Sequence, residues 1–580
     1  MKILFFSPHS YFTVHSLPEK VVANALLTNN NEIISVGCNG LYSSFCVCMT
    51  AHKYNIDNKI KQSICKECKF NRNKLINNNN FKNINIDDFI SDIEINFVND
   101  EVLMLNQLSF LDYTWNSIPI SRYALYEFLL NRKLNSTTFD NDEWNEYKIH
   151  FKNALFTAIA GYKILNDFKP DRLTTYNSNY SVNHIMCALA DKCNIPHYSL
   201  HAGGHLKNRL EEMTIFKGYL ASYSWNSHKI WSEYLKYPIN KKSIFYVNSH
   251  IEMLLSAKSP WVYSVKGKKL SENDLKKYFG ILPHQKVLVA TMSSEDERYA
   301  AEIVGNIPSK QTPLFKTNFE WINYLINLVK NDETLFLLIR VHPREFPNKR
   351  ENVLSKQANI LETSFKDLPK NIKVNFPKDN ISLHDLIKIT DVCLNSTSTS
   401  GLEFLLFGIP VVIYDKNQLY SYGTELNFMS DNLDSYKENI LNAIICGKSL
   451  INVINTYRWL SYRNEIASVN IKDGYQAYEY PRLLKKVFYL FNFIYLRNRI
   501  EFFLFKLHNH NVINSKKLTV AIENGINSHL DNIDIELYKY NSSFEERNLI
   551  IASLLKFTNI VSNEESDPIF VKTIKEICNG

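Results

Sequence analysis

The sequence lacks any long apolar run. In its 580 residues there is no uninterrupted apolar segment of about 18 residues, the length that a helix needs to cross a bilayer. The amino terminus has one lysine and a short apolar stretch at residues 3–6, which is too short for an export signal and fits a first buried strand. We therefore expect a cytoplasmic protein with no membrane-spanning helix and with mostly reduced cysteines.

A strong charge of either sign is also lacking. The formal net charge is +7, and no run of Lys and Arg alternates with aromatic residues, so the sequence does not indicate nucleic-acid binding. A mildly basic chain suits an anionic substrate or an anionic membrane surface. With 45% hydrophobic and 22% charged residues, the composition is that of a soluble globular protein. The length predicts about two or three domains.

Strands alternate with helical segments in the second half of the chain, which predicts a parallel, doubly wound sheet. Four polar turns follow the carboxyl ends of the expected strands. Their sequences are SSEDE after residues 287–291, HPRE after 335–341, PKD after 373–376 and NSTSTS after 392–395. Open α/β sheets bind ligands at this edge, so the four turns predict a site there.

The most informative stretch is residues 391–415, DVCLNSTSTSGLEFLLFGIPVVIYD. It predicts a buried strand, a hydroxyl-rich turn, a short helix and a second buried strand. Ser400 and Glu403 have the spacing of a capping box, and the exposed amides of a helix start suit an anion. A capped helix in a parallel sheet would also explain the stretch without any ligand.

The turn RVHPRE carries the second candidate group. Guanidinium groups such as those of Arg340 and Arg344 fit phosphate in a bidentate manner, and the imidazole of His342 can donate to a phosphate oxygen or assist a leaving group. The alternative is that His342 caps the strand and the arginines are solvated.

The first half also begins with strand–helix units. We expect strands at residues 3–6, 33–37, 173–176 and 197–200, and helices at 18–27 and 182–193. At the other end of the chain, residues 485–508 are aromatic and basic. They fit either a helix packed across both domains or an interfacial helix on an anionic membrane, and apolar residues on many faces favour the packed helix.

Two motifs together resemble a known family. LLIRVHPRE followed by DLIKITDVCLNSTSTSGLEFLLFGIPVV is similar to the carboxyl-terminal domain of bacterial capsule and surface-polysaccharide biosynthesis proteins, which are GT-B glycosyltransferases related to the capsule Kdo transferases. FFSPHSYFTVHSLPEKVVANAL and YNSNYSVNHIMCALADKCNIPHYSLHAGG resemble the amino-terminal half of these proteins more loosely.

The resemblance implies an α/β, GT-B fold. Two Rossmann-like doubly wound domains would face a cleft, with an acceptor domain at residues 1–265, a nucleotide-sugar donor domain at 266–480 and a helical extension at 481–580. Arg340, His342 and Arg344 would bind donor phosphate. Glu403 would bind the ribose or only cap its helix. The family's Lys before the Pro of a GKP turn is Ile409 here, so no cation contact is assigned there. The hydroxyls that would bind phosphate or a sugar carboxylate are those of Ser398, Thr399 and Ser400.

Glycosyl transfer needs a base for the acceptor hydroxyl and charge stabilisation at the leaving phosphate. The amino-terminal half offers several histidines and one carboxylate near the expected site edge. We select His15, Glu19 and His201, and His342 as a further catalytic candidate on the donor side. No carboxylate pair calls for a catalytic metal, and the family resemblance implies none.

Five of the ten cysteines lie within residues 38–68. Cys65 and Cys68 have CxxC spacing, and Cys38 and Cys46 could complete a tetrahedral zinc site. Buried free thiols are the alternative reading of the same residues.

The resemblance therefore implies an inverting, metal-independent glycosyltransferase. It would move a sugar, by preference a CMP-activated acidic sugar, from a nucleotide donor onto a glycan or lipid-linked glycan of the cell surface, with peripheral contact to the inner membrane. The alternatives are a CDP-glycerol-type glycerophosphotransferase, a sugar-nucleotide 2-epimerase of the same fold and a non-catalytic partner protein.

Overall fold

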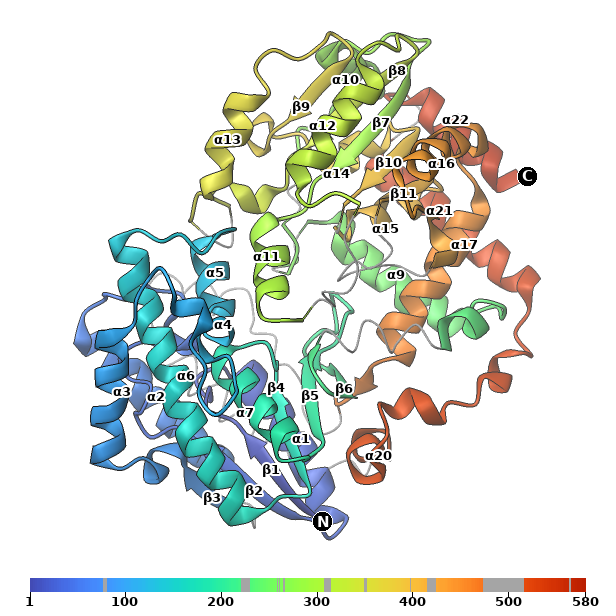
Figure 1. Cartoon of the computed structure of the whole chain (residues 1–580). Helices are drawn as coiled ribbons and strands as arrows, with labels where there is room; N and C mark the ends of the chain where they lie inside the picture. Colours follow the sequence, from blue (N-terminus) through green and yellow to red (C-terminus); the bar gives the residue numbers. More distant parts are fainter. Residues whose placement is uncertain are drawn as a thin grey trace.

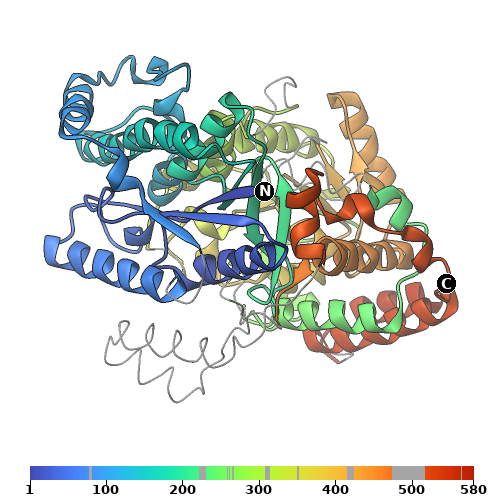
Figure 2. The ribbon, with the colours of Figure 1, turned by 90° about the horizontal axis from the view of Figure 1, so that it is seen from below.

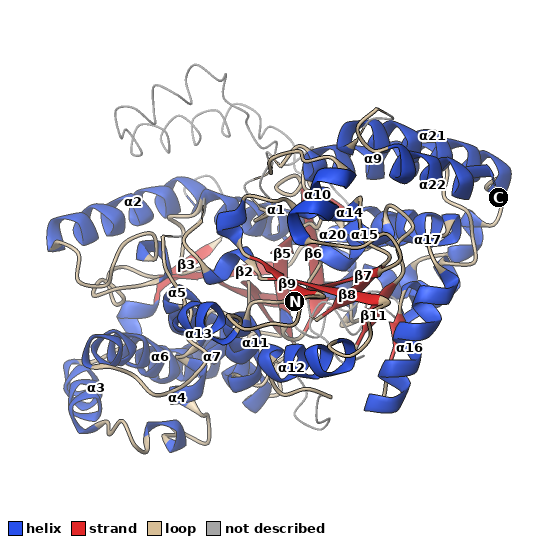
Figure 3. Cartoon of the chain, turned by 90° about the horizontal axis from the view of Figure 1, so that it is seen from above, coloured by secondary structure: helices blue, strands red, loops and turns tan. Residues whose placement is uncertain are grey.

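The chain forms two α/β domains, each built on its own sheet (Figure 1). The computed structural model describes residues 1–76, 81–220, 230–257, 259, 261–263, 267–306, 314–348, 352–396, 398–414, 424–472, 516–562 and 565–579. Both sheets lie inside the molecule with helices around them, as Figure 3 shows. None of the helices in these ranges is long and apolar enough to cross a membrane. The predicted helix at residues 485–508 lies outside the described residues.

The amino-terminal sheet has the strand order β13-β6-β5-β4-β1-β2-β3. Neighbouring strands from β3 to β5 pair in parallel, and β6 is antiparallel to both β5 and β13. The order reverses direction between β1 and β4, which makes the carboxyl ends of these two strands a topological switch point. The strands are β1 (Lys2–Phe6), β2 (Glu32–Gly37), β3 (Lys82–Asn85), β4 (Arg172–Tyr176), β5 (His197–Ala202), β6 (Glu212–Lys217) and β13 (Val469–Asn470).

Helices cover this sheet and form a large insertion between β2 and β4. The longest of the described helices, α6, starts at a capping box made by Asp140 and Glu143 and buries 16 of its 28 residues, many of them in the apolar core of the domain. The helices are α1 (Thr13–Thr28), α2 (Asn58–Ile76), α3 (Asp92–Met104), α4 (Ile120–Tyr123), α5 (Tyr126–Arg132), α6 (Asn141–Phe168) and α7 (Ser181–Lys192).

The helix predicted at residues 18–27 starts earlier than expected. It begins at Thr13 and contains Pro18 in its interior. Amides of His15 and Ser16 bond to the carbonyl of Phe12 and close the first turn, so the proline falls in the second turn. Glu19 therefore lies beyond the amino-terminal turn, and the helix dipole is not the reason for its presence.

The carboxyl-terminal sheet is wholly parallel, with the order β12-β11-β10-β7-β8-β9. Its switch point lies between β7 and β10. Every residue of β8 is buried, as expected of a strand covered on both faces. The sequence-based strands of this half are confirmed as β7 (Lys286–Thr291), β8 (Leu335–Arg340), β9 (Ile372–Asn375), β10 (Val392–Asn395) and β11 (Val411–Ile413). A further short strand, β12 (Phe428–Met429), was not predicted.

Short and medium helices connect these strands. Ser382 caps α14 in a capping box with Asp385. The helices are α11 (Glu295–Ile303), α12 (Asn318–Val329), α13 (Lys356–Ser364), α14 (Leu383–Ile387), α15 (Ser400–Leu405) and α16 (Leu433–Cys446).

The chain crosses between the domains more than once. Helices α9 (Lys241–Leu255), α17 (Leu450–Ser461) and α21 (Ser543–Val561) pack together on the carboxyl-terminal core. Figure 2 shows α9 in green beside the red carboxyl-terminal helices. In contrast, β13 joins the amino-terminal sheet, and α20 (Lys516–Asn524) packs on α1 and β6. The other α-helices of the described residues are α10 (Glu272–Phe279) and α22 (Pro568–Asn579). The predicted domain boundaries stay predictions.

A buried lysine ties the two domains together. Lys133 ends α5 in the left-handed conformation, with φ 52°, and is 2% exposed. Its Nζ donates to the carbonyls of Arg344 and Val353 in the other domain, the latter at 2.6 Å. A charged donor shared by backbone carbonyls satisfies groups that would otherwise be buried without partners.

Replacing Lys133 by Met should lower the free energy of unfolding by about 1–3 kcal/mol, because these carbonyls lose a buried donor. Urea unfolding followed by tryptophan fluorescence measures the change. Lys169→Met is the matched control, since Lys169 ends α6 in the same left-handed conformation but is exposed. Equal losses in the two variants would contradict the role given to Lys133.

Candidate functional site

Three aromatic rings stack at the switch point of the amino-terminal sheet. His15 of α1 lies on Tyr176 at the end of β4, with ring centroids 4.4 Å apart and an interplanar angle of 20°. His201 of β5 stacks on the same tyrosine, at 6.0 Å and 23°. The structure thus brings together His15 and His201, which were predicted from the sequence as site residues, around Tyr176, which was not predicted.

Glu19 reaches the same tyrosine through the backbone. Its Oε1 accepts from the amide of Tyr176 at 3.1 Å, and the side chain is buried. Burial raises the pKa of Glu19 to about 8, although hydrogen bonds from Ser7 and from the Tyr176 amide oppose the shift. The carboxyl group is therefore mostly protonated at neutral pH.

The histidines of this cluster are held in the neutral form. Burial, reinforced by His9 and His201, lowers the pKa of His15 to about 3. Burial and the charge of Arg209 lower the pKa of His201 to about 4. A neutral imidazole has one acceptor nitrogen, which can receive a proton from a hydroxyl group.

His205, in contrast, holds the backbone of its own loop. One ring nitrogen lies 2.9 Å from the carbonyl of Tyr246, and the other accepts from the amides of Lys207 and Asn208. Both ring nitrogens of His205 are therefore engaged by backbone groups, and the side chain is fully buried.

The switch point of the carboxyl-terminal sheet is a polar network. Thr291 at the end of β7 donates to Asn395 at the end of β10, at 2.8 Å. The Ser396 hydroxyl lies 2.8 Å from the side-chain oxygen of Asn318 and 2.9 Å from the hydroxyl of Tyr414. These bonds fix the start of the hydroxyl-rich turn.

The three hydroxyl residues predicted to bind the donor, Ser398, Thr399 and Ser400, differ in exposure and in hydrogen bonding. Thr399 is exposed, and Ser398 is half-buried with its Oγ accepting from the amide of Ser400 at 3.2 Å. The Oγ of Ser400 is buried and makes no hydrogen bond within the described part of the chain. A buried hydroxyl without a partner costs free energy, and a bound ligand could supply the missing bond.

The predicted capping box at this helix is wrong. The N-cap is Thr399, with no side-chain capping bond, and Glu403 instead bonds Nε2 of His384 at 2.9 Å. Glu403 lies one turn inside α15, and His384 of α14 competes successfully for its carboxylate. The capping role for Glu403 is excluded, and its role as a ribose ligand stays a prediction.

Arg340 ends β8 close to this pair. Its Nη1 donates to the side chain of Asn375 and to the carbonyl of Ile381. Burial lowers the pKa of Arg340 to about 10, against the attraction of Asp379, Asp385 and Glu403, so the guanidinium keeps its charge at neutral pH.

The other two members of the RVHPRE turn face the neighbouring domain. Arg344 pairs with Asp296 at 2.8 Å and donates to the carbonyl of Leu130 at 2.7 Å. His342 is half-buried, with Nδ1 accepting from the amide of Arg344 and its ring edge against Tyr263. Phosphate contacts of these two residues stay a prediction.

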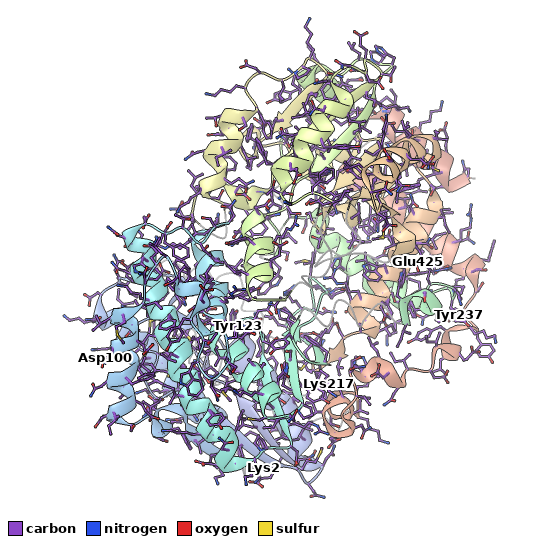
Figure 4. All side chains as sticks on the ribbon, viewed as in Figure 1. Lys2, Asp100, Tyr123, Lys217, Tyr237 and Glu425 are labelled. Carbon is purple, nitrogen blue, oxygen red and sulfur yellow. The ribbon has the colours of Figure 1, made fainter. Side chains whose placement is uncertain are left out.

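The two switch points lie on facing edges. Asn306, after α11 of one domain, donates to Asn179, just past β4 of the other, at 3.0 Å, and Arg344 follows the end of β8. On the carboxyl-terminal side these contacts come from residues that follow β7 and β8, and on the amino-terminal side from Asn179 after β4 and from α5. In Figure 4, Lys2 at the amino end of β1 lies on the side away from the carboxyl-terminal domain.

The predicted cysteine cluster forms in space. Cys38, Cys46, Cys65 and Cys68 line one small cavity together with Cys48, and all of them are free thiols. Within the residues described, no group of three or more His, Cys, Asp or Glu side chains is arranged so that it could hold a metal ion. Structural zinc at these four cysteines stays a prediction.

Two Rossmann-like domains with facing switch points, and a chain that returns to the first domain after the second, define the GT-B fold class. The predicted fold class is therefore confirmed. It rests on the strand order and the crossings of this chain.

The comparison with solved structures aligns this chain with several sugar-active enzymes at low identity. Thermosulfurimonas dismutans KpsC, a beta Kdo 2,4 transferase, aligns over 49% of this chain and 78% of its own, with 11% identity and a TM-score of 0.30. The UDP-GlcNAc 2-epimerase of Neisseria meningitidis aligns over 80% and 98%, with 11% identity and a TM-score of 0.24. The calicheamicin glycosyltransferase CalG4 aligns over 80% and 94%, with 12% identity and a TM-score of 0.25. No protein-family model and no curated protein matches the sequence.

The buried carboxyl of Glu19 makes stability depend on pH. Its pKa is about 8 in the folded protein, against 4.5 for an unperturbed glutamate, so as the pH rises between these values only the unfolded chain releases the proton. The wild type should lose about 2–5 kcal/mol relative to Glu19→Gln over this window.

Urea unfolding of both proteins at pH values across the window measures this difference. Glu32→Gln is the control, because Glu32 is exposed at the start of β2. Parallel curves for the wild type and Glu19→Gln would mean that the carboxyl is ionised in the folded protein.

Proposed function

We propose that the chain is a glycosyltransferase of the GT-B class that moves a sugar from a nucleotide donor to a glycan or lipid-linked glycan of the bacterial surface. The observation that supports it best is the pair of facing switch points. One carries the charged Arg340 and the Ser400 hydroxyl, which has no partner among the described residues, and the other carries neutral histidines beside a carboxyl group. The preferred donor is a CMP-activated acidic sugar, by resemblance of the two motifs.

The donor would occupy the carboxyl-terminal edge. Ser398, Thr399 and Ser400 would donate to phosphate or to the sugar carboxylate. Both hydrogen bonds that Arg340 makes to described residues come from Nη1, so Nε and Nη2 can face a ligand anion. Glu403, held by His384, would accept from the ribose hydroxyls.

The acceptor would occupy the amino-terminal edge. In direct displacement, the acceptor hydroxyl attacks the anomeric carbon, the bond from that carbon to the phosphate oxygen breaks, and a base takes the hydroxyl proton. Among the candidates, Glu19 has the pKa closest to neutral pH, which is the best match for a general base. His15 and His201 would orient the hydroxyl. No metal is assigned to this chemistry.

A nucleotide thermal-shift screen tests the donor site. One of CMP, CDP, UDP and GDP should raise the melting temperature, because a ligand at about 100 times its Kd stabilises a protein by about 2.7 kcal/mol. Stabilisation by none of the four would count against a nucleotide-sugar enzyme.

Two serine variants separate ligand binding from folding. Ser400→Ala should leave the melting temperature of the free protein nearly unchanged and reduce the shift by nucleotide, since its hydroxyl has no partner among the described residues. Ser396→Ala should lower the melting temperature of the free protein and leave the shift by nucleotide nearly unchanged, because its hydroxyl bonds Asn318 and Tyr414. A full nucleotide shift in Ser400→Ala would remove this hydroxyl from the site.

The pH profile of transfer tests the base. With Glu19 as the base, kcat/KM should rise about tenfold per pH unit up to about pH 8 and then level, and Glu19→Gln should lose the rising limb. A profile that stays flat between about pH 6 and pH 9 would assign the proton transfer to a histidine instead.

An assay without acceptor distinguishes an epimerase, which would still convert its sugar nucleotide.

A further inference from the structure

A closed loop at the end of β5 carries an arginine beside His201. The connection from β5 to β6 covers residues 203–211, and because the two strands are antiparallel it begins directly where β5 ends. The amide of Gly203 donates to the carbonyl of Arg209 at 3.2 Å and to that of Glu212 at 2.8 Å. The backbone of Arg209 therefore lies next to Gly203, at the carboxyl end of the strand that carries His201.

Close packing fixes the conformation of this loop. One ring nitrogen of His205 accepts from two amides of the loop. A Cβ on Gly203 would lie 2.7 Å from the Cβ of Glu212. A Cβ on Gly204 would lie 2.4 Å from the side-chain oxygen of Asn464, so only glycine leaves room for these contacts. The loop thus presents the side chain of Arg209 from a fixed backbone.

The side chain of Arg209 lies over an aromatic ring and close to the ring stack on Tyr176. Its guanidinium carbon is 5.2 Å from the ring centroid of Trp261, which is 36% exposed. Burial, and after it the charge of Arg209, lowers the pKa of His201. Burial raises the pKa of Tyr176, and the charge of Arg209 opposes this rise. A half-buried positive charge therefore acts on two of the three stacked rings.

The segment that contacts Arg209 also reaches the RVHPRE turn. Tyr263 follows Trp261 by two residues, and its hydroxyl accepts from Nη1 of Arg344 at 3.0 Å. The ring of Tyr263 contacts His342 edge to face, with centroids 5.5 Å apart. One short segment therefore contacts a guanidinium on each side, Arg209 at the acceptor edge and Arg344 beyond the end of β8.

We propose that Arg209 forms an anion subsite at the acceptor edge and selects an acceptor that carries a carboxylate or a phosphate near the reacting hydroxyl. The inference rests on the proposed function and adds a specificity residue to it. A guanidinium binds either anion through two parallel hydrogen bonds. The anion is the carboxylate of an acidic sugar or a phosphate on the glycan, and Arg209 holds it beside the histidines that orient the hydroxyl.

The cost of covering a charge favours an anionic acceptor over a neutral one. A neutral sugar that covers the half-buried guanidinium removes water from it and supplies no opposite charge. A carboxylate or a phosphate replaces that water with charge-assisted hydrogen bonds. Trp261 already restricts the guanidinium, so less side-chain freedom is lost when the anion binds. Selectivity for charge is therefore the property expected of Arg209.

Matched pairs of small sugars test the preference for charge. Methyl glucuronide has a carboxylate where methyl glucoside has a hydroxymethyl group, and glucose 6-phosphate differs from glucose by a phosphate. Binding of each sugar to the full-length protein is measured by saturation-transfer difference NMR at constant ionic strength. At least one charged sugar should bind about tenfold more tightly than its neutral partner. A preference confined to the glucuronide identifies a carboxylate, and one confined to the sugar phosphate identifies a phosphate.

Two variants assign the preference to the Arg209 side chain. Arg209→Gln should remove it and leave the binding of the neutral sugars unchanged. Arg209→Lys should keep part of it, because the charge remains but the two parallel hydrogen bonds are lost. Arg122→Gln is the matched control and should behave like the wild type, since Arg122 is an exposed arginine of α4 in the same domain.

Melting curves show which variants are folded. If Arg209→Gln is not, the comparison of Arg209→Lys with the wild type is the test, and an unchanged preference in Arg209→Lys would contradict the bidentate contact. Equal binding of charged and neutral sugars by the wild type would overturn the proposal. So would a preference that persists in folded Arg209→Gln, because the anion would then bind elsewhere.

The same measurements separate this inference from the proposed function. A nucleotide thermal shift without any preference for charged sugars would leave the glycosyltransferase in place and remove the anion subsite. A preference that depends on Arg209, without a shift by any nucleotide, would keep the anion subsite and count against the nucleotide-sugar enzyme.

Discussion

The orientation of the two domains toward each other depends most directly on one buried guanidinium. Arg344 lies between the domains, 5% exposed, and pairs with Asp296 of its own domain while donating to the Leu130 carbonyl of the other. Burial alone would lower its pKa, but the carboxylates of Asp296 and Glu297 outweigh that effect and raise it. Removing one partner of such a buried pair costs about 3–5 kcal/mol, because the remaining charge is left without compensation.

This ion pair explains why the carboxyl ends of the strands in the carboxyl-terminal sheet face the amino-terminal domain. Arg344 follows the end of β8, and Asp296 follows the end of β7, so the pair can reach α5 only if the carboxyl ends of that sheet face the amino-terminal domain. The Lys133 side chain makes the reciprocal contact from α5 to the same loop. Arg344 and Lys133 thus cross the interface in opposite directions, and together they restrict rotation of one domain relative to the other.

The sequence predicted the elements better than the contacts between them. Strand ends and polar turns could be located because apolar runs and turn residues are local signals, and the expected strand, helix and strand formed at residues 392–395, 400–405 and 411–413. The partner of Glu403 could not be found in this way. Capping-box spacing is a local rule, and His384, 19 residues earlier in the chain, satisfies the carboxylate instead.

Tyr176 was missed for a similar reason. Its position between His15 and His201 depends on the pairing of β1, β4 and β5, which no spacing in the sequence encodes.

The loop at residues 8–12 links the two unusual features of the amino-terminal domain. On one side its backbone contacts Cys68, and on the other it leads into the first turn of α1, where His15 meets Tyr176. The first turn of α1 has no side-chain cap, and Pro18 cannot donate a backbone bond in the next turn, so the helix itself holds this segment weakly. The thiol cluster therefore supplies an anchor that the helix start lacks. In the carboxyl-terminal sheet the corresponding turn is fixed instead by side-chain hydrogen bonds, from Thr291 to Asn395 and from Ser396 to Asn318.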